Sequence, residues 1–287
     1  MEHNSINING KLIDLNVPRV MGVINMTPDS FYKGSRHENP ESVLSVVSGM
    51  IEDGADFIDI GGCSTRPGSA SPGPEEEKRR VLPAIKKITS EFPRAIVSVD
   101  TFRAAVARDA LCDCGAHMIN DVSGGEADPG MFSLVRELNV PYILMHMQGT
   151  PGTMQDHPEY DDIVADILQY FGRKIVDLHS GGVRDIILDP GFGFGKTADH
   201  NFELLRRFRE LKVSGLPLMA GLSRKSMVWK TLGITPDQAL PGTVVLNTVA
   251  LLNGANILRV HDVKEARQAI NLVERIKAGS SDHMFID

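Results

Sequence analysis

The chain has 287 residues, of which 42% are hydrophobic and 23% are charged, and this composition is that of a folded globular protein with ample material for a core. Its formal net charge of -7 opposes nonspecific attraction to nucleic acid, so that an anionic partner would have to meet a local basic cluster.

The first ten residues, the length of the apolar runs and the number of cysteines argue against a secreted, a membrane-spanning or a disulfide-rich protein. The first ten residues lack the basic and apolar regions of a signal peptide, and no apolar run approaches the roughly 18 residues of a membrane span. Three cysteines, Cys63, Cys112 and Cys114, are too few for a disulfide framework and lack the partners of a zinc site. We therefore expect a cytoplasmic protein without a membrane segment or a nucleic-acid partner.

Short runs rich in Val and Ile recur along the chain, and helix-like sequence separates them. The predicted strands are Val20–Asn25, Phe57–Gly62, Ile96–Asp100, His117–Asp121, Tyr142–His146, Ile186–Asp189, Leu218–Gly221 and Ile257–His261. The intervening segments, such as Pro40–Ala55 and Phe102–Ala116, have apolar residues at helical spacing and a glycine near the end.

Strands that alternate with helices in this way predict an α/β fold, a (β/α)8 barrel that forms a single domain over residues 1–287. An open doubly wound sheet is the alternative, but such a sheet rarely needs eight evenly spaced parallel strands. The opening residues Ser5–Leu15 predict a short hairpin that closes the bottom of the barrel.

In parallel barrels the active site lies at the C-terminal ends of the strands, because the following loops converge there. The polar residues at those ends are Asn25, Asp59, Asp100, Asn120, Asp121, His146, Asp189, Arg259 and His261. Any one of them could simply cap the next helix. Their recurrence on almost every strand favours a binding site.

These side chains are of two chemical kinds. Carboxylate and amide groups suit a flat heterocycle with N–H donors and ring acceptors, such as a guanine-like or pterin-like ring, and are found at Asp100, Asn120 and Asp189. The later strands supply a basic cluster that would suit a phosphate or diphosphate: Arg224, Lys225, Arg259 and His261.

The stretch Ile187–Thr197 ends in Gly-Lys-Thr and looks at first like a phosphate-binding loop. A Walker A loop needs a glycine where this chain has Pro190, and proline has no N–H to offer a phosphate. We therefore do not expect this stretch to bind a phosphate.

Two other chemistries find little support. A hydrolytic zinc site typically needs several clustered His ligands, and only His146 and His261 stand at strand ends. Cys63 has no evident His partner to make it a nucleophile.

Motifs in a fixed order cover nearly the whole chain: Gly22–Phe31, Phe57–Gly68, Ser98–Thr101, Ile119–Asp121, Met145–Gly149, Leu188–Lys196, Gly221–Ser226 and Arg259–Val263. Together they closely resemble the dihydropteroate synthases, a family of pterin-binding barrels. The resemblance implies a transferase of folate biosynthesis, of the class that sulfonamides target. Such an enzyme joins 6-hydroxymethyl-7,8-dihydropterin diphosphate to 4-aminobenzoate, releases diphosphate by leaving-group ionisation with Mg²⁺, and forms 7,8-dihydropteroate.

The resemblance also implies site residues. Those for the pterin are Asp100, Asn120, Met145, Asp189, Phe194 and Lys225. The stretch Ile187–Thr197 would then aim Asp189 and Phe194 at the pterin, with Lys196 as a surface or loop-supporting residue. Those for the diphosphate are Asn25, which would also hold the Mg²⁺, Arg66, Arg259 and His261. Those for the 4-aminobenzoate pocket are Phe31, Thr65, Pro67 and Ser226. The catalytic set would be Lys225, Asp100, Asp189, Arg259 and His261.

Two positions depart from the family pattern, because Lys33 and Cys63 stand where acidic residues are common. They leave open a non-catalytic pterin-binding paralogue. Another alternative is a methyltetrahydrofolate:corrinoid methyltransferase, which should lack the basic residues around Lys225 and Arg259. The resemblance further implies a homodimer, to which the apolar segment Thr243–Ala255 could contribute.

Overall fold

The computed structural model describes residues 4–26, 40–63, 72–149, 152, 154 and 158–279. Its main sheet consists of β3 (Arg19–Asn25), β4 (Phe57–Gly61), β5 (Ile96–Asp100), β6 (Met118–Asp121), β7 (Tyr142–Met145), β8 (Ile186–Asp189), β9 (Met219–Ala220) and β10 (Ile257–Val260). A separate antiparallel hairpin pairs β1 (Ser5–Ile8) with β2 (Lys11–Asp14).

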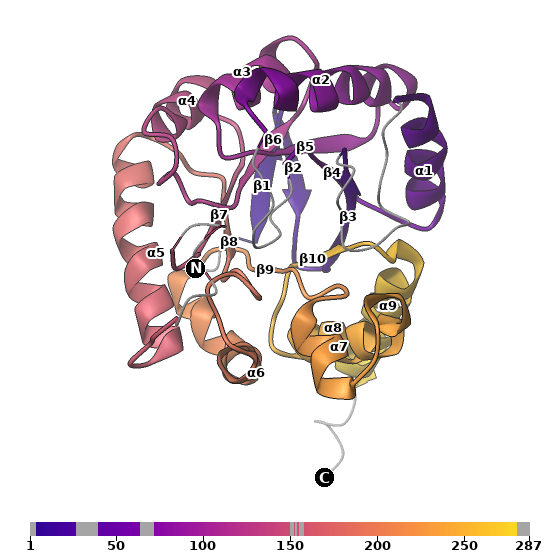
Figure 1. Cartoon of the computed structure of the whole chain (residues 1–287), viewed down its shortest axis with the longest axis vertical. Helices are drawn as coiled ribbons and strands as arrows, with labels where there is room; N and C mark the ends of the chain where they lie inside the picture. Colours follow the sequence, from indigo (N-terminus) through magenta and orange to yellow (C-terminus); the bar gives the residue numbers. More distant parts are fainter. Residues whose placement is uncertain are drawn as a thin grey trace.

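The main sheet is parallel and runs in the order β8-β7-β6-β5-β4-β3-β10-β9. A bridge between Leu188 and Leu218 joins its two outer strands, so the sheet curls into a nearly closed barrel. Figure 1 shows the helices arranged around it. The predicted (β/α)8 barrel is thereby confirmed, together with all of its predicted strands and the N-terminal hairpin.

A helix follows each strand of the barrel. The helices are α1 (Pro40–Glu52), α2 (Pro74–Glu91), α3 (Ala104–Cys112), α4 (Met131–Leu138), α5 (Ile163–Ser180), α6 (Ala198–Arg206), α7 (Ser226–Leu232), α8 (Leu240–Leu252) and α9 (Val263–Gly279). Short 3-10 turns, η2 (Phe208–Ser214) and η3 (Pro236–Gln238), lie among the later ones.

Local sequence explains several helix starts. Proline opens α2 and glutamates fill its first turn, where the helix dipole favours negative charge. The Asp162 carboxylate accepts hydrogen bonds from the N–H groups of Val164 and Ala165, which would otherwise lack partners at the start of α5.

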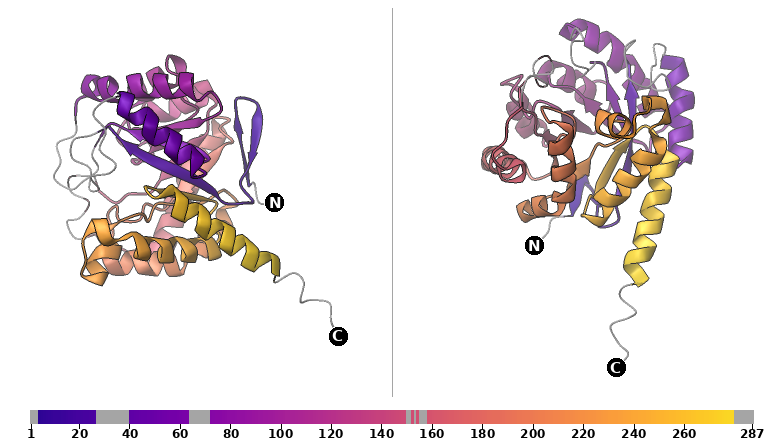
Figure 2. Two further views of the ribbon diagram at one scale, coloured as in Figure 1. Left: turned by 90° about the vertical axis from the view of Figure 1, so that its right-hand side faces the viewer. Right: turned by 60° about the horizontal axis from the view of Figure 1, so that its bottom comes forward.

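Side chains along each strand alternate between the surrounding helices and the barrel interior. The lowest interior layer is apolar and includes Met21, Phe57, Met118, Ile143, Ile187, Met219 and Ile257. The hairpin packs Ile6, Ile8 and Leu15 against this layer, and Figure 2 shows the hairpin at one end of the barrel. The bottom of the barrel is therefore closed, and polar interior residues are confined to the levels above.

No helix in the described part of the chain is long and apolar enough to span a membrane.

Candidate active site

Polar residues occupy the interior positions above the apolar layer. In β4 the interior residue after Phe57 is Asp59, and in β10 the interior residue after Ile257 is Arg259. The register of the sheet sets Asp100 beside Asn120. The period of two along each strand thus brings residues from distant parts of the chain to one level of the barrel. We call this level the polar level, and it consists of Asp59, Asp100, Asn120, Asp189 and Arg259.

Arg259 ties several of these groups together. Its Nε donates to Asp59 Oδ2 at 2.7 Å, and one terminal nitrogen donates to Asp100 Oδ2 at 2.6 Å. Asn120 donates its amide N–H to the same Asp59 oxygen at 2.9 Å. The guanidinium therefore bridges carboxylates from two neighbouring strands and fixes their spacing.

These carboxylates keep capacity for a ligand. Burial raises the pKa of Asp100 to about 7, although the Arg259 charge works in the opposite direction. Asp59 is fully buried, and its Oδ1 has no hydrogen-bond partner among the described residues. A buried acceptor of this kind is costly unless a donor meets it.

Asp189 and Lys225 form a second part of the site. The Asp189 Oδ1 accepts from Gly191 N–H at 2.8 Å, and burial raises the pKa of this carboxyl while the charge of Lys225 opposes the rise. The Lys225 Nζ donates to the carbonyl of Phe192 and lies 4.4 Å from the centroid of the Phe194 ring. A carboxylate, an ammonium and an aromatic face thus converge at the ends of β8 and β9.

The remaining candidates lie at neighbouring strand ends. Asn25 ends β3 and is half-buried, Met145 ends β7 and lies against the Gly191 turn, and Ser226 begins α7 and is exposed. Burial, and then the charge of Arg259, lower the pKa of His261 to about 4. His261 is therefore neutral at pH 7, and its Nδ1 shares a hydrogen bond of 3.0 Å with Ser223 Oγ.

Lys196 is buried, so the surface alternative for this residue is wrong and the loop-supporting one is confirmed. Its Nζ donates to the carbonyls of Gly191 at 3.1 Å and Phe194 at 3.0 Å, and lies 3.1 Å from His146 Nδ1. Thr197 caps α6 through a hydrogen bond from His200 N–H. The Lys-Thr pair therefore organises its own loop.

Several strand-end residues belong to the scaffold. The sequence grouped Arg224 with Lys225, Arg259 and His261 as a basic cluster. In the structure its guanidinium instead makes a bidentate ion pair with Asp262 and also donates to backbone carbonyls. Asp121 accepts from Ser123, from Gly125 N–H and from the Tyr142 hydroxyl.

The predicted residues Phe31, Thr65, Arg66 and Pro67, together with the departure at Lys33, lie outside the described residues. One residue of the described site was given no role from the sequence. Asp59 stood among the strand-end residues, but only its contacts with Arg259 and Asn120 show that it joins the polar level.

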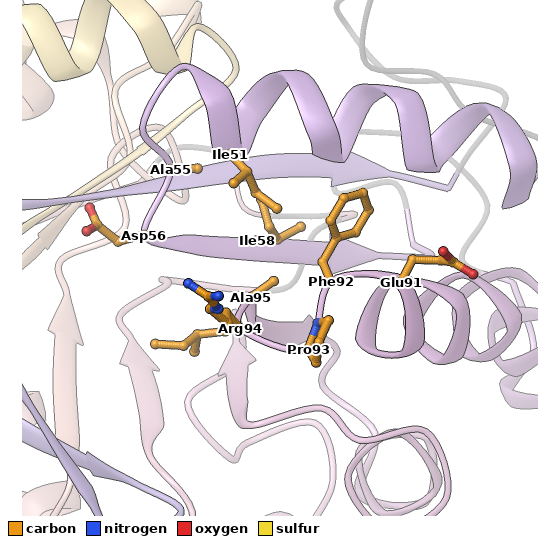
Figure 3. Close-up of a pocket in the computed structure, with 10 residues that line it drawn as sticks. Ile51, Ala55, Asp56, Ile58, Glu91, Phe92, Pro93, Arg94 and Ala95 are labelled. Atoms are coloured by element: carbon orange, nitrogen blue, oxygen red, sulfur yellow. The ribbon is translucent and has the colours of Figure 1, made fainter.

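A separate cavity of about 390 Å³ lies near the opposite ends of the strands, between the ends of α1 and α2. Figure 3 shows Ile51, Ile58, Phe92 and Arg94 around it. It has two carboxylates: Asp56 is already paired with Arg19 and Arg267, and Glu91 is exposed. This cavity is thus distinct from the polar level at the C-terminal ends.

Comparison with known proteins agrees with this geometry. The family model described as "Pterin binding enzyme" matches residues 21–261. The fold, the polar level and this match define the chain as a pterin-binding barrel enzyme.

Particular relatives narrow the class. Dihydropteroate synthase of Escherichia coli strain K12 is 43% identical over 267 residues, which cover 92% of this chain and 94% of the relative. The structure of Yersinia pestis dihydropteroate synthase in a sulfonamide drug complex has 42% identity and a TM-score of 0.91 over 96% of this chain and 99% of that one. The enzyme from Xanthomonas albilineans, in complex with 7,8-dihydropteroate, has 37% identity and a TM-score of 0.84, with coverage of 96% and 99%. The chain belongs to the dihydropteroate synthase family and is a transferase.

Proposed function

We propose that the chain condenses 6-hydroxymethyl-7,8-dihydropterin diphosphate with 4-aminobenzoate to give 7,8-dihydropteroate and diphosphate. The observation that carries the proposal is the convergence of Asp100, Asn120 and Asp189 with the cations Lys225 and Arg259 on one end of the barrel. A related barrel is known in complex with 7,8-dihydropteroate, which supports the same product here.

In the proposed reaction the bond between the pterin methylene and the diphosphate oxygen breaks first, and its electron pair leaves with the diphosphate. The electron-rich dihydropterin stabilises the cationic methylene, the amine nitrogen of 4-aminobenzoate attacks it, and that nitrogen then loses a proton. No protein nucleophile is needed. Asp100, Asn120 and Asp189 would orient the ring, while Lys225 and Arg259 would stabilise the anion that develops.

We further propose Mg²⁺ as the cofactor, with Asn25 as its ligand from this chain. Mg²⁺ prefers oxygen ligands and is often held by few protein groups together with substrate phosphates and water. The amide oxygen of Asn25 fits that role, and no group of acidic, His or Cys side chains within the described ranges forms a complete protein cage. When bound, the ion would act as a Lewis acid on the leaving diphosphate. Arg66 and His261 are proposed as further diphosphate contacts.

The test is diphosphate release by the purified protein with the pterin diphosphate, in the presence and absence of 4-aminobenzoate and of Mg²⁺. We expect release to depend on both and to match the dihydropteroate formed. Binding of the pterin diphosphate without release would instead indicate a non-catalytic paralogue. Methyl transfer from methyltetrahydrofolate to a corrinoid would indicate the other alternative.

Lys225 and Arg259 favour the synthase over the corrinoid-dependent alternative. Arg259 makes an ion pair with Asp100, and the charge of Lys225 acts on Asp189, so both cations lie beside carboxylates that would read the ring. A methyl group transferred from a tetrahydrofolate leaves no diphosphate, so such an enzyme would not need this charge.

We also propose a homodimer formed through α8 and α9. These helices pack together and leave large apolar side chains exposed, including Val245, Leu252, Leu272 and Ile276. Exposed apolar surface of this kind marks an interaction face when it is contiguous. Light scattering coupled to gel filtration should give twice the chain mass of 31.3 kDa, whereas a monomer mass at micromolar concentration would contradict the proposal.

A further inference from the structure

Asp59 is a carboxylate of the polar level to which the proposed reaction gives no step. Its side chain is fully buried, and the preceding interior residue of β4 is Phe57 of the apolar layer. Replacing a buried ion pair by well-packed apolar side chains is often neutral or stabilising. Packing alone therefore gives no reason for a charge at this place, and the groups that Asp59 contacts indicate what the charge does.

A single oxygen of Asp59 holds two residues of the site. Asp59 Oδ2 accepts from the Asn120 side-chain amide at 2.9 Å and from Arg259 Nε at 2.7 Å. Asn120 lies on β6 and Arg259 on β10, and in the sheet order each of these strands is two places from β4, on opposite sides. The carboxylate thus connects the two donors across the barrel interior.

This contact fixes which way the Asn120 amide faces. A carboxylate offers only acceptors, so the amide must turn an N–H towards Asp59 and its oxygen away. Among the described residues no group donates to Asn120 Oδ1. The acceptor arm of the amide therefore remains for an N–H of a ring.

The same contact fixes the plane of the Arg259 guanidinium. Its Nε is bound to Asp59, and one terminal nitrogen donates to Asp100 Oδ2 at 2.6 Å. Because a guanidinium is planar, two bound N–H groups determine the orientation of the whole group. Within the described ranges the other oxygen of Asp100 accepts no hydrogen bond, so it too remains for a ligand.

The charge of Asp59 also acts on Asp100. Burial raises the pKa of Asp100 to about 7, the charge of Arg259 opposes the rise, and the charge of Asp59 adds to it. The other charged groups that interact with this carboxyl are Glu77 on α2, Asp121 on β6 and Lys225 before α7. Without the charge of Asp59, Asp100 would ionise at a lower pH.

We propose that Asp59 is a positioning residue of the ring site, which holds Asn120 and Arg259 in the orientation that leaves acceptors of Asn120 and Asp100 for the pterin. This inference rests on the ring-binding part of the proposed function. Asp59 acts on the ring through these three residues.

The experiment measures the affinity of the wild type and of Asp59→Asn for 6-hydroxymethyl-7,8-dihydropterin by calorimetry, from about pH 5 to about pH 8.5. This probe carries no diphosphate whose own titration would enter the profile. Wild-type affinity should be fully present above the pKa of Asp100, about 7, and should decrease as the pH falls through it, because a protonated carboxyl turns a donor towards the ring.

Asp59→Asn keeps the shape of the side chain and removes its charge. At about pH 8, where Asp100 is ionised in both proteins, we expect the affinity to fall about five- to tenfold, since charge-assisted hydrogen bonds that orient Asn120 and Arg259 are lost. The pH at which binding declines should also move to a lower value, because one charge that raises the pKa of Asp100 is gone.

Asp59→Glu separates charge from geometry. Glutamate keeps the charge and changes the length of the side chain, so the affinity at about pH 8 should fall while the pH of the decline stays close to that of the wild type. Asp59→Ala repeats the loss of charge without any atom that can clash, and it should shift the decline in the same direction as Asp59→Asn.

The matched control is Asp56→Asn. Asp56 directly precedes β4, and its carboxylate pairs with Arg19 and Arg267 near the opposite end of the strand. This variant weakens comparable ion pairs, so urea unfolding should show lower stability. Its affinity for the dihydropterin and the pH at which binding declines should equal those of the wild type.

The outcomes separate the two proposals. A wild type that binds the dihydropterin but forms no dihydropteroate would overturn the proposed reaction, while the variants would still decide the role of Asp59. A wild type that does not bind the ring would overturn both. Unchanged affinity in Asp59→Asn, lower affinity without a shift of the decline to lower pH, or a loss only of folded protein in both Asp59→Asn and Asp59→Ala would overturn the role of Asp59 alone.

Discussion

Aspartates at the strand ends show how much a residue's role depends on its partners. Both carboxylate oxygens of Asp121 accept hydrogen bonds within the protein, from the backbone N–H groups of Ser123 and Gly125 and from the Tyr142 hydroxyl. Asp189 uses one oxygen for Gly191 N–H, and the positive charges of Lys225, Arg259 and Lys196 act on its carboxylate. The first is a structural cap, and the second retains acceptor capacity for a ligand.

Replacing Asp189 by Asn tests the assignment of the ring site. An asparagine oxygen can still accept from Gly191 N–H, so the turn should survive, but the second acceptor and the negative charge are lost. We expect affinity for the pterin diphosphate to fall by about 1 to 3 kcal/mol, measured by calorimetry without 4-aminobenzoate. The control is Asp185→Asn, because Asp185 directly precedes the first residue of β8 and so lies at the other end of that strand from Asp189. Unchanged affinity in Asp189→Asn would place the ring elsewhere.

Lys225 should give the enzyme an alkaline limit. Burial lowers the pKa of Lys225 to about 8, with Asp189 opposing the shift, so the ammonium charge is present below that pH and is lost as the pH rises through it. If this charge stabilises the leaving anion, kcat/KM for the pterin diphosphate should decline above about pH 8.

Two substitutions of Lys225 test whether this residue causes the decline in kcat/KM. Lys225→Ala should abolish turnover without unfolding the protein, and Lys225→Arg should carry whatever activity it retains to higher pH, since arginine stays charged. Near-normal turnover in Lys225→Ala would remove the residue from the site. A flat wild-type profile up to pH 9.5 would contradict the role of its charge.

The sequence predicted the polar level better than it predicted the scaffold residues around it. Asp100, Asn120 and Asp189 could be placed because the period of two in a strand fixes which residues face inward. Arg224 was misplaced because its partner, Asp262, is 38 positions away, and no local pattern reports that pairing. Asp59 was given no role for the same reason, since Arg259 lies 200 positions further on.

At the scale of elements, the glycine-rich segment between β8 and α6 supports the part of the candidate site that contains Asp189. Gly191 has a φ of 69°, and a Cβ atom there would lie 2.0 Å from the carbonyl oxygen of His146. Glycine therefore allows the segment to lie against the end of β7. The buried Lys196 side chain then links the segment to the end of β7, because its Nζ lies 3.1 Å from His146 Nδ1.

Lys196→Met should weaken both the fold and the ring site. Methionine fills similar space but removes the donor to the Phe194 carbonyl and the contact with His146 Nδ1, while the Gly191 carbonyl keeps a hydrogen bond from Phe194 N–H. A buried acceptor that is left unsatisfied costs about 1 to 3 kcal/mol. Urea unfolding should show the loss of stability, and calorimetry should show weaker binding of the pterin diphosphate. The exposed Lys264→Met is the control. Wild-type values for both quantities would show that the ammonium does not support the segment.

Element boundaries were less predictable than the elements themselves. The sequence predicts a strand over Leu218–Gly221, but the observed β9 contains only Met219–Ala220. Leu218 pairs with β8 through a single bridge where the barrel closes, and Pro217 before it has no N–H to extend the ladder. Closure is a property of the whole sheet, which a local pattern does not contain.

At the scale of the whole molecule, the barrel separates stability from chemistry. The hairpin closes the bottom with apolar side chains, while the ionisable groups of the candidate site lie at the upper levels. At the bottom of the barrel Asn256, which directly precedes β10, is linked to the end of the N-terminal hairpin, because its side-chain amide donates to the Leu15 carbonyl at 2.8 Å. Substitutions at the bottom should therefore change stability without changing the reaction.

The hairpin provides a matched pair of leucines for that test. Leu15 is fully buried against the bottom layer, whereas Leu12 is 71% exposed. Leu15→Ala should lower the free energy of unfolding by about 2 to 5 kcal/mol, because it removes buried methyl groups and leaves a cavity. Leu12→Ala should change it by less than about 0.5 kcal/mol. Both variants should retain the wild-type kcat well below their unfolding temperatures. A lower kcat in folded Leu15→Ala would mean that the closed bottom also sets the geometry of the polar level, and the two ends of the barrel would then be coupled.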